Sequence, residues 1–410
     1  MTIVVGRLVQ AAAKLRGGGT ALPGLVVEKL EPDFAVKLLS ELPLGVVLVS
    51  GTNGKTTSVK VVTELLQAAG LKVFTNNTGS NFMRGVISSL LRKVSIRGHL
   101  DADIAVLELD EAHAVSFVSA IKPRYTLLLN VMRDQMDRFG EISYTAELLT
   151  AVACNTTDLV VLNREDALLA AIPYKEKLAA EVRWFGLTDE LRSEFTAFVP
   201  GQENAAALLA SFSGNTAHIK LDDTTCEVPL TLKGIYNAYN ATAALALVHA
   251  IVPETPVAVL TAALSRVHSP FGRGESVDVN GTSVELILVK NPSGFDLALR
   301  SFDANDCATM ITISDDYGDG RDVSWLYEVD FGSLEQNGVA MVSGSRAFDM
   351  ALRLEYNEVA LQAAETDLKI GLDRFLATSP QLPHRIFCSY TTMLSLRKLL
   401  ASQATLEQVI

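Results

Sequence analysis

Residues 46–57 read VVLVSGTNGKTT. The four apolar residues Val46–Val49 predict a short buried strand, and the apolar spacing after Lys55 predicts a helix. Gly51 and Gly54 lie in the turn between them. Glycines let backbone N–H groups close around an anion, and a helix N-terminus adds its positive end. The stretch therefore predicts a phosphate-binding loop at the end of a strand.

Two side chains of this loop are expected to act on the bound phosphates. Lys55 would reach the outer phosphates, and the Thr56 hydroxyl would take a place on Mg²⁺. The longer P-loop pattern has a further glycine where this chain has Val49, so the match is to the shorter form GTNGKT. The alternative is an ordinary Gly-rich strand–helix turn. We expect the nucleotide site to include Gly51, Thr52, Asn53, Gly54, Lys55, Thr56 and Thr57.

The short loop resembles that of the ATP-dependent Mur ligases, and further stretches agree with them. NVMRDQMDRFG at 130–140 resembles their N-x-x-x-D-H-x-D stretch, and NRED at 163–166 resembles their N-x-D-D turn. GIYNAYNA at 234–241 resembles the helix start that faces the nucleotide base. The resemblance runs from Gly19 to about Tyr356, nearly the whole chain.

Two C-terminal motifs resemble the MurT family, the ligase subunits of lipid II isoglutaminyl synthase, and ordinary Mur ligases lack them. They are KNPSG at 290–294 and DDYGDGRDVSW at 315–325. The resemblance implies an ATP- and Mg²⁺-dependent synthetase that acts in peptidoglycan biosynthesis. It would amidate the D-glutamate α-carboxylate of the lipid II stem peptide through an acyl phosphate. Ammonia would come from a GatD-type glutaminase partner, because this chain shows no recognisable glutaminase nucleophile.

The MurT resemblance gives Asp322 a role on that partner. In the family this aspartate of D-G-R-D-x-S-W is thought to complete a Cys-His pair on the glutaminase. A carboxylate orients a catalytic imidazole and fixes its tautomer. The aspartates Asp315, Asp316, Asp319 and Asp322 also allow an acidic loop that caps a helix, or a Ca²⁺-type loop. A Ca²⁺ loop of the EF-hand kind would need a glutamate at its twelfth position, which is missing.

The Mur ligase resemblance assigns a metal ligand and a second polar turn. Glu108 ends an apolar strand where such ligases hold Mg²⁺ with a glutamate. Of Glu108 and Asp110 we expect Glu108 to bind the metal. The alternative is that Glu108 forms a structural ion pair. Catalysis would therefore depend on Lys55 and Glu108, besides Asp322. Asn163 belongs to the N-x-D-D turn and is expected to contact the nucleotide.

Three more residues are expected near the nucleotide, each with a simpler alternative. Asn237 and Asn240 share one helix face and would contact adenine, or would only cap the helix. Arg273 lies at the predicted hinge between domains, where many ligases place an arginine on ATP, or it is a solvated surface arginine. Gln135 replaces the histidine of the ligase motif. A neutral amide does not bind metal as imidazole does, so a rearranged second metal site is expected.

Composition limits the class of protein. The 410 residues are 49% hydrophobic and 20% charged, which excludes global disorder. A net charge of −12 argues against general nucleic-acid binding. The four cysteines are far apart without a C-x-x-C, whereas many MurT relatives carry a four-cysteine zinc ribbon, so we expect no zinc. The N-terminal apolar run is too short for a signal sequence. We expect a cytoplasmic protein that works peripherally at the inner membrane face, where lipid II lies.

Apolar strands alternate with helical stretches, which predicts an α/β protein with mainly parallel sheets. We expect an N-terminal helical segment (1–40), a Mur ligase-like central ATP-binding domain (41–270) and a C-terminal Rossmann-like domain (271–410). Central strands are expected at 46–49, 73–75, 104–109, 125–130 and 159–163, and C-terminal strands at 284–289, 307–313, 338–342 and 358–360. Two other functions remain open. One is a stand-alone amino-acid ligase of the Mur or folylpolyglutamate synthase type, and the other is a P-loop NTPase that acts as a switch.

Overall fold

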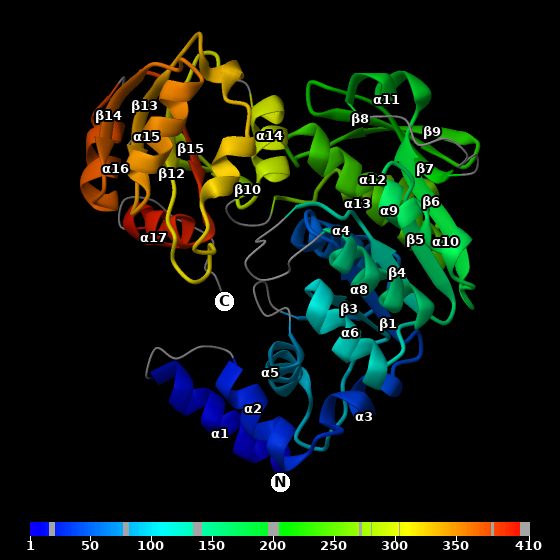
Figure 1. Ribbon diagram of the computed structural model, residues 1–410. Coiled ribbons are helices and arrows are strands. Elements are labelled where there is room, and N and C mark those ends of the chain that lie inside the picture. Colours follow the sequence, from blue (N-terminus) through cyan, green and yellow to red (C-terminus); the bar gives the residue numbers. More distant parts are fainter. Residues whose placement is uncertain are drawn as a thin grey trace. The chain divides into compact units, whose positions relative to one another are not determined.

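The computed structural model of the protein (Figure 1) describes residues 1–15, 21–76, 82–133, 142–195, 205–269, 273–279, 281–302, 304–378 and 381–401. The chain divides into two compact units. The first comprises residues 1–131, 142–231 and 237–267, and the second comprises residues 132–141, 232–236 and 268–410.

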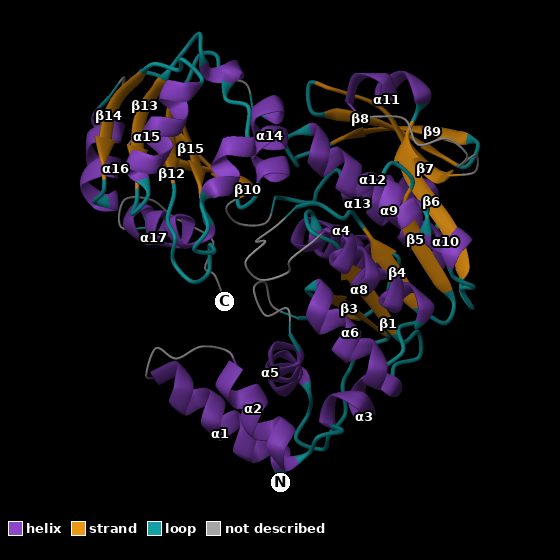
Figure 2. Ribbon diagram, in the orientation of Figure 1, coloured by secondary structure: helices purple, strands orange, loops and turns teal. Residues whose placement is uncertain are grey.

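The first unit is built on a nine-stranded sheet with the order β2-β3-β1-β4-β5-β6-β7-β8-β9 (Figure 2). Its strands are β1 (Val46–Ser50), β2 (Val73–Thr75), β3 (Ile104–Glu108), β4 (Tyr125–Leu128), β5 (Leu159–Asn163), β6 (Glu181–Leu187), β7 (Ala205–Ser213), β8 (Thr216–Leu221) and β9 (Thr224–Pro229). Neighbours from β2 to β7 are parallel, and β8 and β9 add antiparallel strands. The central strands β1, β3, β4 and β5 are buried at every position, as expected for a parallel sheet with both faces covered by helices.

Helices cover this sheet, and the first three precede it in the chain. They are α1 (Thr2–Leu15), α2 (Ala21–Leu30), α3 (Phe34–Ser40), α4 (Lys55–Ala68), α5 (Met83–Lys93), α6 (Glu111–Ala120), α8 (Ile142–Cys154), α9 (Ala167–Ala170), α10 (Ile172–Lys175), α11 (Asp189–Phe195), α12 (Ile235–Ile251) and α13 (Val257–Leu264). α4 packs on β1, β2 and β3, and α1 and α2 pack on α5. Val27 and Phe34 of the N-terminal helices share one core with Val86 and Leu90 of α5.

The second unit is a six-stranded sheet with the order β10-β11-β15-β12-β13-β14, parallel except for β10. Its strands are β10 (Arg273–Val279), β11 (Thr282–Leu288), β12 (Ala308–Thr312), β13 (Val339–Ser343), β14 (Leu361–Glu365) and β15 (His384–Cys388). Its helices are α14 (Pro292–Ser301), η1 (Ser324–Glu328), η2 (Gly332–Leu334), α15 (Ala347–Tyr356), α16 (Leu368–Ala377) and α17 (Tyr390–Leu400). Two separate apolar clusters show that both faces are covered. The predicted fold class, two mainly parallel α/β sheets, is confirmed.

One predicted strand is wrong. Residues 358–360 precede the strand, and β14 covers Leu361–Glu365. Glu358 has a φ of +57°, which a residue within a strand does not adopt.

Within the described ranges, no helix is long and apolar enough to cross a membrane.

Candidate active site

The turn between β1 and α4 has the shape of an anion cradle. Gly51 has a φ of +129°, and a β-carbon there would lie 3.0 Å from the backbone N and O of Asn130. Gly54 has a φ of +88° directly before α4, and a β-carbon there would lie 2.4 Å from Asn240 Oδ1. Only glycine fits both positions. The first N–H groups of a helix lack intrahelical partners, which is why a helix start such as that of α4 can bind a phosphate.

Replacing Gly54 with alanine should weaken nucleotide binding more than it weakens the fold. The left-handed backbone of a non-glycine residue costs about 1–3 kcal/mol. The added methyl group would in addition push Asn240 away from the turn. Gly70→Ala is the matched control, because Gly70 has a φ of +90° but open space around its β-carbon. We expect both variants to lose thermal stability and only Gly54→Ala to lose ATP affinity in calorimetric titration. Equal affinities would contradict the cradle.

The ammonium of Lys55 is held inside the turn. Lys55 Nζ donates to the carbonyl oxygens of Gly51 at 2.6 Å and Thr52 at 3.3 Å. It also lies 3.4 Å from Asp110 Oδ1 and 3.7 Å from Glu111 Oε2, and its side chain is 7% exposed. This pairing with Asp110 and Glu111 was not predicted from the sequence. Both follow β3, which is paired in parallel with β1, so their place after an adjacent strand was the available signal.

Thr56 and Glu108 meet beside the turn. Thr56 Oγ1 donates to Glu108 Oε1 at 3.0 Å, and both residues are buried. Val49 pairs with Glu108 in the β1–β3 ladder, which brings the end of β3 to the start of the loop. The Asn76 side chain donates to the Glu108 carbonyl and accepts from its N–H, both at 2.9 Å, and so fixes the end of β3. Asn76 was not among the predicted site residues.

Hard oxygen atoms of these two residues fit the chemistry of Mg²⁺. Mg²⁺ is commonly held by one or two protein oxygens together with phosphate oxygens and water. Thr56 Oγ1 and Glu108 Oε1 supply such a pair next to the cradle. Among the described residues, no group of three or more His, Cys, Asp and Glu side chains could hold a metal alone. Gln135 and the predicted second metal site lie outside the described residues.

Asn130 clamps the turn from the end of β4. Its Oδ1 accepts from the Asn53 N–H at 2.8 Å, and its Nδ2 donates to the Asn53 carbonyl at 3.1 Å. Its own carbonyl accepts from the Thr52 N–H at 3.0 Å. Asp166, the N-cap of α9, accepts from the N–H of Val131 at 2.6 Å. The chain stretch after β4 is thereby fixed to both the phosphate turn and the turn after β5.

Asn163 braces neighbouring parts of the sheet edge. Its Nδ2 donates to the Leu129 carbonyl at 2.7 Å, and its Oδ1 accepts from the Glu165 N–H at 2.9 Å and the Tyr239 hydroxyl at 2.5 Å. Burial raises the pKa of Tyr239 well above its ordinary value, so this hydroxyl stays a neutral donor. Tyr239 was missed by the sequence analysis. A nucleotide contact of Asn163 stays a prediction.

The two asparagines of α12 differ in position. Asn240 lies against Gly54 of the phosphate turn, because a β-carbon added at Gly54 would lie 2.4 Å from Asn240 Oδ1. Asn237 is 0% exposed and lies within the packed part of α12. The adenine contacts of both stay predictions. Arg273 begins β10, and its side chain lies outside the described ones, so its ATP contact is also a prediction.

A second candidate site, in the second unit, surrounds Asp322. This side chain is exposed, and its Oδ1 accepts from the Ser324 N–H at 2.8 Å at the start of η1. Hydrogen bonds from Ser324 lower the pKa of Asp322, so it is ionised at neutral pH. Asp319 is instead buried and accepts from Ser389 Oγ at 3.1 Å and the Thr391 N–H at 3.0 Å. Asp322 is therefore presented to solvent, whereas Asp319 ties two loops together.

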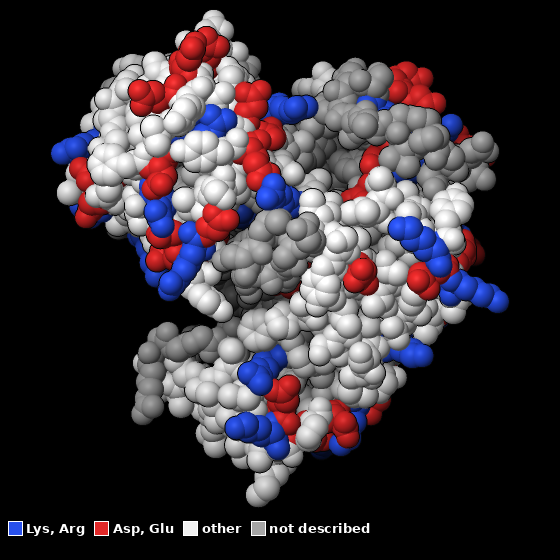
Figure 3. Space-filling model, viewed as in Figure 1, with Lys and Arg blue, Asp and Glu red and all other residues white. Residues whose placement is uncertain are grey.

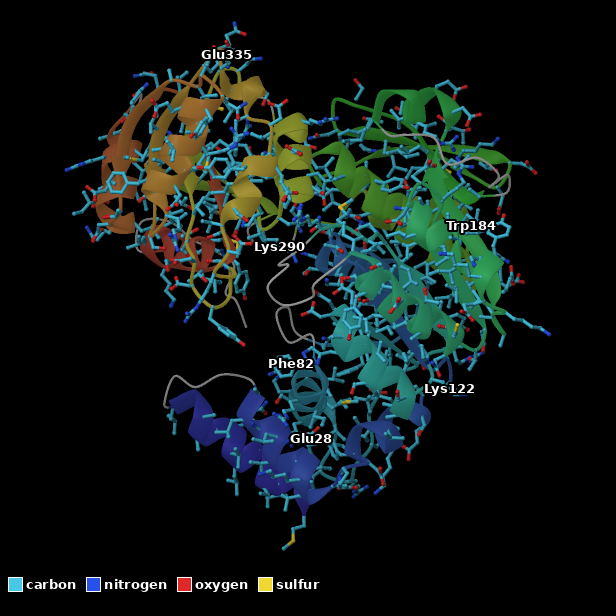
Figure 4. The ribbon with its side chains drawn as sticks, in the orientation of Figure 1. Glu28, Phe82, Lys122, Trp184, Lys290 and Glu335 are labelled. Atoms are coloured by element: carbon cyan, nitrogen blue, oxygen red, sulfur yellow. The ribbon has the colours of Figure 1, made fainter. Side chains whose placement is uncertain are left out.

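Phe295, the residue after the KNPSG motif, packs against the other C-terminal motif. Lys290, labelled in Figure 4, is the second residue after β11, and Asn291 caps α14 by accepting from the Gly294 N–H at 2.7 Å. Phe295 on α14 has its ring 6.4 Å from that of Trp325 in η1. The motif after β11 thus supports the segment that carries Asp322.

Comparisons with known proteins match two parts of the chain to protein families. The model described as Mur ligase middle domain matches residues 49–248, and MurT ligase C-terminal matches residues 288–393. The chain is 26% identical to the lipid II isoglutaminyl synthase (glutamine-hydrolyzing) subunit MurT of Streptococcus pneumoniae, with 98% of this chain and 96% of that protein covered.

Solved structures show the same fold at low identity. MurF from Acinetobacter baumannii superimposes with a TM-score of 0.70 at 16% identity, covering 93% of this chain and 80% of that one. Folylpolyglutamate synthase from Mycobacterium tuberculosis, complexed with ADP and AMPPCP, gives a TM-score of 0.64 at 15% identity, covering 98% and 100%. The chain therefore belongs to the Mur ligase superfamily of ligases, and its C-terminal domain is that of the MurT ligases.

Proposed function

We propose that this chain is the ATP-dependent synthetase subunit of a lipid II isoglutaminyl synthase. The observation that carries the proposal is one chain with two sites, the phosphate cradle with Lys55, Thr56 and Glu108, and the exposed Asp322 of the MurT motif. We also propose the domain division at residues 40 and 270, with Arg273 at the start of the C-terminal domain.

The reaction proceeds in two steps. An oxygen of the D-glutamate α-carboxylate attacks the γ-phosphorus of ATP, the bond to the β-phosphate oxygen breaks, and ADP leaves. Ammonia then attacks the acyl phosphate carbon, and phosphate leaves with the bonding electron pair to give D-isoglutamine. Lys55 neutralises charge on the moving phosphoryl group. Bound Mg²⁺, held by Thr56 and Glu108, would supply further charge neutralisation.

A GatD-type glutaminase is the proposed source of ammonia. The second unit offers it an exposed apolar stripe, in which the α15 residues Phe348, Leu352 and Tyr356 are 67%, 46% and 68% exposed. Tyr327 of η1 continues the stripe, with its ring 6.0 Å from that of Tyr356. Contiguous exposed apolar side chains are typical of protein interfaces. The stripe therefore reaches η1, which begins two residues after Asp322, and a partner on Asp322 would cover it.

Replacing Leu352 with glutamate should weaken the complex with the glutaminase. A charge in the middle of an apolar contact must be desolvated, so we expect the dissociation constant to rise by at least about tenfold. Ile370→Glu is the matched control, because Ile370 is 44% exposed on α16, which packs with the other apolar cluster of this unit. Calorimetric titration measures both. Equal losses, or none, would argue against this surface.

Reconstitution tests the function itself. The chain, a GatD-type glutaminase, ATP, Mg²⁺, glutamine and lipid II should together yield ADP and amidated lipid II, detected by mass spectrometry. Ligation of a free amino acid without glutaminase would instead indicate a stand-alone ligase. ATP hydrolysis without an amide product would indicate a switch.

Nucleic acid is not a proposed partner, and Figure 3 shows acidic and basic side chains interspersed on the face drawn.

A further inference from the structure

Arg133 lies in the chain stretch that begins at the phosphate turn. Asn130 is clamped to Asn53 by two hydrogen bonds of 2.8 and 3.1 Å. Three residues later, Arg133 already belongs to the second unit. There its Nη1 lies 2.7 Å from Glu328 Oε1, and the two side chains are 44% and 38% exposed.

Glu328 is the last residue of η1, the short helix whose first turn is bonded to Asp322. The remainder of η1 is fixed from behind. Arg353 of α15 donates to the carbonyl oxygens of Leu326 at 3.0 Å and Val329 at 2.6 Å. These bonds come from the buried side, since Arg353 is 8% exposed. Arg133 reaches the same element through Glu328, whose side chain is 38% exposed, and Asp322 is exposed as well.

The charge of Arg133 also acts on Asp322. Hydrogen bonds from Ser324 are the main cause of the lowered pKa of Asp322, and attraction by the Arg133 guanidinium adds to them. An exposed ion pair contributes little to stability because water screens it. An ion pair that positions a neighbouring carboxylate and favours its charged form acts on the rate and not on stability. Small displacements of a positioning group have large effects on rate.

We infer that Arg133 is a positioning residue for Asp322, and that it acts through its ion pair with Glu328. The pair holds the exposed side of η1, so that the Asp322 carboxylate faces the glutaminase histidine in a fixed orientation. This inference rests on the proposed function, in which Asp322 serves the partner glutaminase. One chain stretch thereby contacts the phosphate turn through Asn130 and the Asp322 segment through Arg133.

The test uses the complex of the full chain with its glutaminase and compares glutamine-driven with ammonia-driven amidation. Arg133→Gln and Glu328→Gln should each lower the glutamine-driven kcat by about three- to tenfold, an effect of the size expected when a positioning contact is loosened. The ammonia-driven rate and the KM for ATP should stay unchanged. The double variant Arg133→Glu/Glu328→Arg should recover most of the glutamine-driven rate, because it restores the pair with reversed charges.

Arg374→Gln is the matched control, since Arg374 makes an exposed ion pair of 3.2 Å with Glu365 in the same unit. It should leave both rates unchanged. Unchanged rates in Arg133→Gln, or no recovery in the charge-reversed variant, would overturn the inference. Asp322→Asn separates the two proposals. If that variant keeps the wild-type ratio of rates, the role of Asp322 itself fails. If the ratio falls in Asp322→Asn but stays at its wild-type value in Arg133→Gln, only the inference about Arg133 fails.

Discussion

Replacing Lys55 with alanine is expected to lower the rate of amidation by about two to three orders of magnitude, with glutamine or with ammonia as the nitrogen source. A charge-assisted contact to a transferring phosphoryl group strengthens in the transition state, so its loss falls on kcat. The two nitrogen sources should suffer alike, because the ATP-dependent step precedes the arrival of ammonia. ADP release and product formation, followed together, measure the effect.

The surroundings of Lys55 decide how this experiment is controlled. Its ammonium lies between two loop carbonyls and the carboxylates of Asp110 and Glu111. Removing it leaves two negative groups near each other without their cation, so thermal unfolding must be measured beside the rate. Lys60→Ala is the matched control, a half-buried lysine on the same helix. A near wild-type rate in a folded Lys55→Ala protein would refute the phosphate-loop interpretation.

The first-unit sheet could be predicted closely from the sequence because its strands are buried on both faces. Such strands appear as continuous apolar runs between turn residues. The predicted bounds of 73–75 and 159–163 are those of β2 and β5. The phosphate turn was predictable for a similar local reason. Its glycines and Lys55 lie within residues 51–55, so one short segment contains the groups expected to bind phosphate.

The strand β15 was not predicted, because its polar residues depend on contacts outside the strand itself. β15 is a central strand that contains His384 and Arg385, which alone suggest a surface strand. The fold accommodates them because His384 Nε2 lies 2.9 Å from the Thr378 carbonyl and Arg385 pairs with Glu285 at 2.9 Å. Tertiary contacts of this kind override local patterns.

The same limitation applies to the site. The Asn76 brace on Glu108 and the Tyr239 bond to Asn163 join residues 32 and 76 positions apart. Asn76 lies in a segment without a motif of its own, whereas Tyr239 lies within the motif at 234–241 but is not one of its residues that the resemblance places near the nucleotide. The partnership of Lys55 with Asp110 and Glu111 depends likewise on the parallel pairing of β1 with β3. Motifs indicate the groups that are expected to meet the ligand, whereas the groups that hold them in place appear only in the folded chain.

Asp322→Asn is expected to lower glutamine-driven amidation by about two to four orders of magnitude while ammonia-driven amidation persists. An amide has no negative charge with which to stabilise the imidazolium, and it favours the wrong tautomer of the histidine. In the proposed mechanism the first step uses Lys55, Thr56 and Glu108, none of which changes. High concentrations of ammonium salt should therefore bypass the defect.

The structure makes this substitution a clean one. Asp322 Oδ1 accepts from the Ser324 N–H at 2.8 Å, and the amide oxygen of asparagine accepts in the same way. The start of η1 is thereby preserved, and only the charge and the second oxygen are altered. Asp316→Asn is the matched control, because Asp316 is another exposed carboxylate of the same motif.

The decisive quantity is the ratio of glutamine-dependent to ammonia-dependent rate, measured with the glutaminase present. A carboxylate that acts on the partner's histidine changes this ratio when it is neutralised. A carboxylate that only caps η1 leaves the ratio as it is, because asparagine keeps the cap. A carboxylate that binds the metal of the ATP site lowers both rates together. A fall in the ratio for Asp322→Asn, absent in Asp316→Asn, supports the glutaminase role, and an unchanged ratio would exclude it.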